Sequence, residues 1–196
     1  MGKEFKNIHL EDAQLKIMDT FLDPIESDRY FKFFMQNIKW AGGTIKIFGK
    51  EYEIPRMQAW YGDKSANYSY SGLDLEPLEW LPEILEIKTE VENYCQTSFN
   101  SVLFNLYRNG KDSNGWHSDN EKELGPEPII ASISLGQERP FKLKHKTKDL
   151  KHSMNLSDGS LLLMEGSTQK HWKHCIPKSS KMLNPRINLT FRRIFA

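Results

Sequence analysis

The sequence predicts an α+β domain in which two helices precede a β-sandwich or jelly roll. Many short apolar segments are separated by turns rich in Gly, Pro and Asn, a pattern typical of antiparallel sandwiches and barrels. Two longer segments in the first half instead carry apolar residues at helical spacing. We expect the core strands over residues 102–107, 129–135, 140–145, 160–164, 172–176 and 186–193.

The two expected helices cover residues 25–38 and residues 82–94. The first follows Pro24 and the second begins with Pro82, and proline is favoured in the first helical turn. Both have an apolar stripe suited to packing against a core. Residues 1–24 show no pattern that we can interpret.

The composition indicates a single soluble domain over residues 1–196. The net charge of +1 indicates no overall affinity for nucleic acid, so any basic surface must be local. Cys95 and Cys175 do not form a disulfide framework. We find no signal peptide or membrane span, which predicts a nuclear protein in a eukaryote or a cytoplasmic one in a bacterium, with no secretion.

Residues 44–54 read as a β-hairpin with Gly49 at its turn. Phe48, beside the tip, either folds back onto the core or acts as an apolar wedge between stacked bases. Further on, Tyr68 and Tyr70 share one face of an extended segment. They either pack as ordinary strand aromatics or stack on an extruded base.

His117 and Asp119 are two residues apart, so their side chains point the same way in an extended chain. They supply two ligands of a 2-His-1-carboxylate site, which leaves open positions on Fe(II). The third ligand is either His171 or His174, whose odd spacing puts them on opposite faces of an extended segment. Spacing alone does not decide between them. The alternative is that His117 and Asp119 are exposed residues of a Gly-rich turn.

Residues 186–192 alternate strictly, with polar side chains at even positions and apolar ones at odd positions. One face therefore packs a core, and the other carries Arg186 and Arg192. Arginine suits bidentate recognition of carboxylates, and two arginines on one strand suit a ligand with a carboxylate at each end. Asn105 and Tyr107 repeat the alternation. The alternative is a half-exposed strand with its polar face in water.

Together these motifs resemble the AlkB family of Fe(II)- and 2-oxoglutarate-dependent dioxygenases. The shared pattern is Asn-x-Tyr, then His-x-Asp, then a distal His before Arg-x5-Arg, and it runs from about residue 45 to residue 194. The resemblance implies a double-stranded β-helix, or jelly-roll, catalytic core over residues 102–194. It also implies a nucleotide-recognition lid over residues 44–72, within the single domain.

The resemblance further implies the ligands and their residues. The family uses the second histidine of the His-Trp-x-His segment, so His117, Asp119 and His174 would bind Fe(II), with His171 outside the first shell. O2 would be the oxidant and 2-oxoglutarate the cosubstrate. The residues implied for 2-oxoglutarate are Arg186 at the distal carboxylate, Arg192 and Asn105 at the proximal carboxylate, and Tyr107, Asn188 and Thr190 around them.

The implied substrate is an alkylated base flipped out of DNA. Residues 47–50 resemble the finger hairpin of the branch that acts on duplex DNA, which favours the wedge role for Phe48. Tyr70 would stack on the base, and Glu121 would contact its edge. Alternating lysines over residues 141–146 indicate either a protected edge strand or phosphate contacts. The candidate substrate-binding residues are Ile47, Phe48, Gly49, Lys50, Arg56, Tyr68, Tyr70 and Glu121.

The resemblance thus implies an oxidative DNA demethylase that converts 2-oxoglutarate and O2 to succinate and CO2 and releases formaldehyde. We expect a monomer that prefers duplex DNA, with single-stranded DNA and RNA as further possible substrates and no membrane partner. The alternatives are a demethylase of methylated RNA, a hydroxylase of a protein side chain, a nucleic-acid-binding module without catalysis, and a metal-independent jelly-roll binder. The complete set of candidate ligands argues against the last two.

Overall fold

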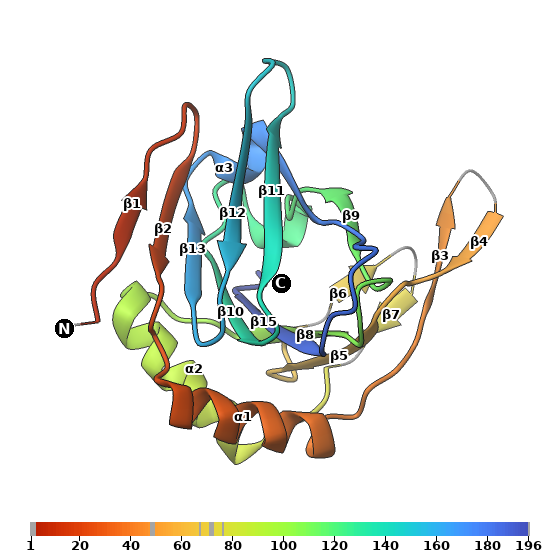
Figure 1. The fold of residues 1–196 in the computed structure, drawn as a ribbon. Coiled ribbons are helices and arrows are strands. Elements are labelled where there is room, and N and C mark those ends of the chain that lie inside the picture. The colour runs from red at the N-terminus through yellow and green to blue at the C-terminus, as the bar shows by residue number, and fades with distance from the viewer. Residues whose placement is uncertain (1–2, 48–49, 67, 71–72, 76, 196) are drawn as a thin grey trace.

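The protein is described here by a computed structural model that covers residues 3–47, 50–66, 68–70, 73–75 and 77–195. Two antiparallel sheets lie at its centre (Figure 1). The larger sheet has the order β1-β2-β13-β10-β15-β8-β5, and the smaller has the order β12-β11-β14-β9. The strands are Lys6–Ile8 (β1), Gln14–Met18 (β2), Met57–Gly62 (β5), Ser101–Tyr107 (β8), Asn114–His117 (β9), Ile130–Gly136 (β10), Arg139–His145 (β11), Lys151–Leu156 (β12), Leu161–Glu165 (β13), Trp172–Ile176 (β14) and Arg186–Arg192 (β15).

Helices α1 (Pro24–Asn37) and α2 (Pro82–Cys95) cover the outer face of the larger sheet (Figure 1). Asp23 begins α1 with a capping box, in which its side chain accepts two main-chain N–H groups while Glu26 bonds back. Both helices bury their apolar stripes in a core that also contains the odd-numbered side chains of β15. The two predicted helices are therefore confirmed.

A second core fills the space between the two sheets. It contains Phe141 and Leu143 of β11, Trp172 of β14, and Ile130 and Leu162 of the larger sheet. The larger sheet is thus covered on both faces, by helices on one side and by the smaller sheet on the other. This arrangement confirms the predicted jelly roll with packed helices.

Several elements were not identified from the sequence. Strands β1 and β2 lie within residues 1–24, so two strands of the larger sheet precede the helices. Strand β2 was missed because Leu15 and Ile17 pack in the core between the sheets while Met18 packs in the core below the helices. Its apolar residues therefore do not keep to one face. The other elements not identified are the strands β5, β7 (Leu73–Leu75), β9 and β12, the short helix α3 (Thr168–His171) and a 3-10 turn over Lys122–Leu124.

Two small hairpins lie on the side of the molecule where β9 forms the edge of the smaller sheet (Figure 1). The predicted hairpin is present as β3 (Thr44–Ile47) paired with β4 (Lys50–Glu53). Strand β6 (Tyr68–Tyr70) pairs with β7 (Leu73–Leu75). Phe48 and Gly49 lie outside the described residues, as do the side chains of Ile47, Lys50, Tyr68 and Tyr70. Within the described part of the chain, every helix is too short or too polar to span a membrane.

Candidate metal and carboxylate site

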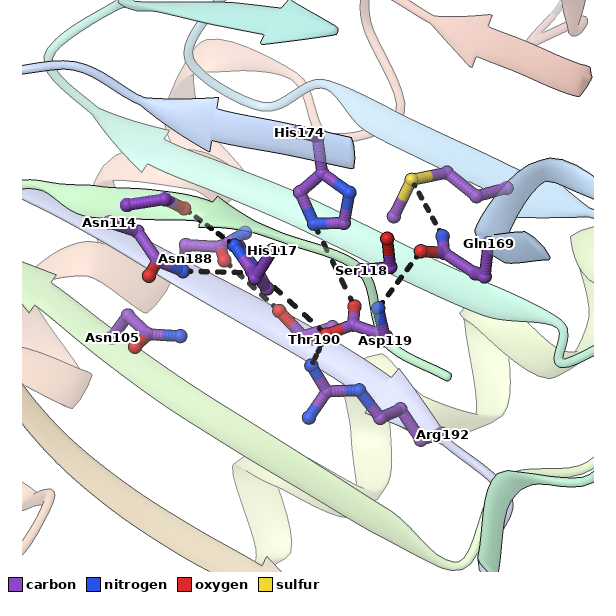
Figure 2. A network of polar contacts seen from close by, with 12 residues as sticks. Asn105, Asn114, His117, Ser118, Asp119, Gln169, His174, Asn188, Thr190 and Arg192 are labelled. Atoms are coloured by element: carbon purple, nitrogen blue, oxygen red, sulfur yellow. Dashed lines mark hydrogen bonds and ion pairs between the residues drawn. The ribbon is translucent and has the colours of Figure 1, made fainter. Parts of the chain in front are cut away.

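Pairing between β9 and β14 creates a cluster of three ionisable side chains (Figure 2). His117 lies directly opposite His174, and their ring centroids are 4.2 Å apart. Asp119 follows the end of β9, with Oδ1 at 3.7 Å from His117 Nε2 and Oδ2 at 3.9 Å from His174 Nε2. One candidate ligand atom from each residue lies within 4.8 Å of the others. The cluster therefore has the composition and spacing of a 2-His-1-carboxylate metal site.

The cluster is held in the protonation states that bind a metal. Burial, with a contribution from His117, lowers the pKa of His174 to about 3, so this imidazole is neutral at neutral pH. Burial alone would raise the pKa of Asp119, but the charge and hydrogen bond of Arg192 outweigh it and hold that pKa well below its usual range. A carboxylate and a neutral imidazole are the forms that coordinate divalent iron.

The tautomer of His117 also suits coordination. Its Nδ1 lies 2.8 Å from the carbonyl oxygen of Gly115, which can only accept, so Nδ1 donates. The hydrogen bond thus selects the tautomer with the proton on Nδ1, in which Nε2 offers its lone pair to the cluster. The side-chain amide nitrogen of Asn114 lies 3.3 Å from Nε2 and can donate to it, which agrees with an unprotonated Nε2.

Arg186 forms a buried cationic site on strand β15 of the larger sheet. Its side chain is 1% exposed, and Nη2 donates to Ser134 Oγ at 2.9 Å. Among the described residues, its Nε and Nη1 atoms have no hydrogen-bond partner. Burial lowers the pKa of Arg186 to about 10, so the group stays charged at neutral pH. A buried guanidinium with unused donors fits the carboxylate of a bound ligand.

Other predicted cosubstrate residues line the same sheet. Tyr107 lies beside Arg186, with its ring centroid 5.2 Å from the guanidinium carbon. Asn188 donates to Ser132 Oγ at 2.8 Å, and Thr190 donates to the Asn188 side-chain oxygen at 3.0 Å. These side chains face the interior between the sheets, as their alternation predicted.

Asn105 of β8 accepts hydrogen bonds from two side chains that were not predicted at the cosubstrate site. Its side-chain oxygen accepts from Arg56 Nε at 2.7 Å and from Gln58 Nε2 at 2.9 Å. Arg56, expected at the nucleotide, therefore also reaches toward the predicted cosubstrate residues. Gln58 was missed because glutamines on exposed strands are common, and only the pairing of β5 with β8 places it opposite Asn105.

Arg192 and Glu121 lie at the edge of the cluster. Arg192 Nη2 bonds Asp119 Oδ1 at 3.0 Å, so this guanidinium neutralises a candidate metal ligand in addition to its predicted place near the cosubstrate. Glu121 precedes the 3-10 turn and is half-buried. Its Oε2 atom is enclosed and has no hydrogen-bond partner within the described chain.

His171 belongs to a different cluster, with Asp12 and His145. The main-chain N–H groups of Thr147 and Lys148 donate to His145 Nδ1 at 3.2 Å and 3.0 Å. The ring proton is therefore on Nε2, which faces Asp12 Oδ2 at 3.3 Å. A protonated nitrogen cannot coordinate a metal, and Lys148 already neutralises Asp12. We interpret this cluster as a structural contact between the β1–β2 loop and the β11–β12 hairpin.

Comparison with known proteins identifies the family. A family model described as the 2OG-Fe(II) oxygenase superfamily matches residues 14–192. Human DNA oxidative demethylase ALKBH2 is 39% identical over 204 residues, covering 98% of this chain and 78% of that protein. The chain belongs to the AlkB family. Bovine alpha-ketoglutarate-dependent dioxygenase alkB homolog 3 is 41% identical over 185 residues, and the aligned region covers 89% of this chain and 64% of that relative.

The structural comparison agrees on the fold. A solved structure of OsALKBH1 superimposes on 95% of this AlkB-family chain with a TM-score of 0.66 at 17% identity. The superfamily uses Fe(II), 2-oxoglutarate and O2. The cluster at His117, Asp119 and His174 fits the metal, and the unused donors of Arg186 fit a carboxylate of the cosubstrate.

The first prediction separates the two candidate histidines. We expect His174→Ala to weaken Fe(II) or Co(II) binding by more than about 100-fold, since changes outside the first shell already cost about 10- to 100-fold. We expect His171→Ala to stay within about threefold of the wild type. Anaerobic metal titration of both variants is the measurement, and the reverse order of effects would show that the ligand assignment is wrong.

The second prediction concerns the carboxylate site. Arg186→Ala should weaken 2-oxoglutarate binding by about 30-fold to several thousand-fold, because losing a buried charged partner costs about 2–5 kcal/mol. Arg193→Ala is the matched control for the loss of one positive charge, because Arg193 is exposed and its described contacts are with Ser98 and the ring of Phe195. Calorimetric titration in the presence of metal gives both affinities, and equal affinities would exclude this role for Arg186.

Proposed function

We propose that this chain is an Fe(II)- and 2-oxoglutarate-dependent oxidative demethylase of N-alkylated bases in DNA. The observation that carries the proposal is that β15 bears both the buried Arg186, with its unused donors, and Arg192, which bonds Asp119 of the His–Asp–His cluster. The name of the human relative, DNA oxidative demethylase ALKBH2, supports the demethylase reaction and its DNA substrate, and the name of the bovine relative supports a 2-oxoglutarate-dependent dioxygenase. In this proposal residues 44–72 form the lid and residues 102–194 form the catalytic core.

Each part of the site has a defined task in this reaction. His117, Asp119 and His174 would hold Fe(II), and Arg186 would bind the distal carboxylate of 2-oxoglutarate. Asn105 and Arg192 would serve its proximal carboxylate, next to the metal. The bound metal and cosubstrate supply the O2-dependent oxidation that converts N–CH3 to N–CH2OH, with succinate and CO2 as the other products. The hydroxymethyl group then leaves as formaldehyde and restores the base.

A lysine-rich outer face of the smaller sheet supports a polyanionic substrate. Lys144 lies directly opposite Lys151 on one side and Lys173 on the other, although like charges in directly opposed positions destabilise a sheet. Protection of an edge strand does not explain Lys144 and Lys173, because β11 and β14 are interior strands. Within the described chain, neither lysine has a carboxylate partner. Phosphate groups would offset this repulsion.

An exposed aromatic side chain lies within the same face. Trp116 is 42% exposed, and Lys144 Nζ lies 4.5 Å above its ring. With neighbouring residues they line a hollow of about 400 Å³. Trp116 and the candidate ligand His117 are consecutive in β9, so this outer face lies across one strand from the metal site. A phosphate backbone lying on it would remain close to a base inserted into the site.

The preference for duplex DNA rests on the sequence of the β3–β4 hairpin. A base within a duplex must be extruded before it can reach the metal, and this costs a few kcal/mol. Phe48 at the hairpin tip would fill the gap that the base leaves. All candidate metal and cosubstrate ligands come from one chain, so a monomer suffices for the proposed site.

The third prediction tests the function itself. Purified chain with Fe(II), 2-oxoglutarate and O2 should release formaldehyde from N-methylated oligonucleotides, with one succinate formed for each formaldehyde. Asp119→Ala serves as the inactive control, because it removes the carboxylate ligand. Methylated duplex DNA, single-stranded DNA, RNA and a peptide set are compared in parallel. Turnover restricted to RNA, or to the peptides, would replace the DNA proposal by the corresponding alternative.

The fourth prediction concerns Phe48. Phe48→Ala should lower the rate on methylated duplex DNA by about tenfold or more, equivalent to losing ~1.4 kcal/mol of compensation for unstacking. The rate on single-stranded DNA should change by less than about twofold, because a single strand has little stacking to lose. Tyr52→Ala, at an exposed position of β4, is the matched aromatic control. Equal losses on both substrates with a lower melting temperature would identify Phe48 as a core residue instead.

A further inference from the structure

Ser118 and Asp119 lie in a loop that follows the end of β9, and we call this loop the metal loop. Strand β9 ends at His117, so no strand ladder fixes the main chain that carries the carboxylate. In place of a ladder, two hydrogen bonds join this main chain to a segment about fifty residues further along, and Figure 2 shows the one between Asp119 and Gln169. The main-chain N–H of Asp119 donates to Gln169 Oε1 at 3.0 Å, and Ser118 Oγ donates to the carbonyl oxygen of Trp172 at 2.7 Å.

Gln169, in the downstream segment, is itself held rigidly. It lies in the four-residue helix α3, is 1% exposed, and its main-chain carbonyl accepts from Lys146 Nζ at 2.8 Å. Its side-chain nitrogen faces the sulfur of Met164 at 3.4 Å, and a thioether is a weak acceptor. Burying an amide against sulfur is unfavourable for packing alone, because Leu or Met would fill this space without a polar group. The hydrogen bond that the side-chain oxygen accepts therefore explains why a glutamine, and not an apolar residue, occupies this position.

We infer that Gln169 is a positioning residue for the proposed metal site, acting through the main chain of Asp119. The amide N–H of Asp119 is buried, and only an acceptor at this point satisfies it. With that bond made, the carboxylate is directed at His117 and His174. Without it, the loop must shift to find another acceptor, and the carboxylate moves with it. The inference rests on the proposed function, since it assumes that Asp119 binds the metal.

Gln169→Leu tests the inference because it keeps the volume and removes the acceptor. The metal-free chain of residues 1–196 is titrated with Co(II) in the absence of O2, and both the affinity and the visible absorption spectrum are recorded. The spectrum reports the coordination geometry and does not depend on turnover. We expect binding weaker by about 10- to 100-fold, the usual effect of losing an outer-shell partner, together with an altered spectrum.

Thr168→Val is the matched control on the same helix. Thr168 is 2% exposed, and its hydroxyl accepts from the N–H of Gln14 at 2.9 Å and donates to the carbonyl oxygen of Glu165 at 2.6 Å. It therefore anchors α3 to its neighbours without touching the metal loop. We expect a lower melting temperature, with Co(II) affinity within about twofold of the wild type and an unchanged spectrum.

Ser118→Ala gives a second test that does not depend on the folding of the glutamine variant. It removes the other hydrogen bond of the loop and should change the Co(II) spectrum and affinity in the same direction. A wild-type spectrum and affinity in Gln169→Leu would overturn the inference, as would an equal effect of Thr168→Val. If Gln169→Leu does not fold, unchanged Co(II) binding by Ser118→Ala would overturn it. Failure of the wild type to bind Co(II) would instead overturn the proposed function.

Discussion

The rest of the structure depends on the burial of both faces of strand β15. One face packs against apolar side chains, and the other lines a polar interior. Ile187, Leu189 and Phe191 enter the core beneath the helices. The even-numbered side chains face the interior between the sheets. A strand with a polar face in water could not place a dry arginine there. The helices anchor one face of β15, and the smaller sheet then encloses the other, together with the metal cluster.

Charges inside this enclosure are stabilised by one another. Burial would favour a protonated Asp119, yet the charge of the neighbouring Arg192 keeps it ionised. The same low polarity keeps His174 neutral. Arg186 differs, because two of its donors have no partner in the described chain. The interior thus holds a satisfied metal-binding half and an unsatisfied anion-binding half, which suits a ligand that bridges them.

The connection between the metal loop and α3 shows how function depends on elements without a sequence signal of their own. Helix α3 has only four residues, and from sequence its last residue, His171, is expected in an extended segment. The break between α3 and β14 rotates His171 toward Asp12 and His145 and leaves His174 facing His117. The choice between the two histidines therefore follows from where a helix ends.

The sequence by itself determined the features that depend on neighbouring residues. Strict alternation identified β15, helical periodicity identified α1 and α2, and the His-x-Asp spacing put His117 and Asp119 on one side. Only the tertiary structure decided which distant residues meet them. Gln169 reaches Asp119 across fifty residues, and Arg56 reaches Asn105 through the pairing of β5 with β8. Such contacts depend on strand register and sheet stacking, which local periodicity does not encode.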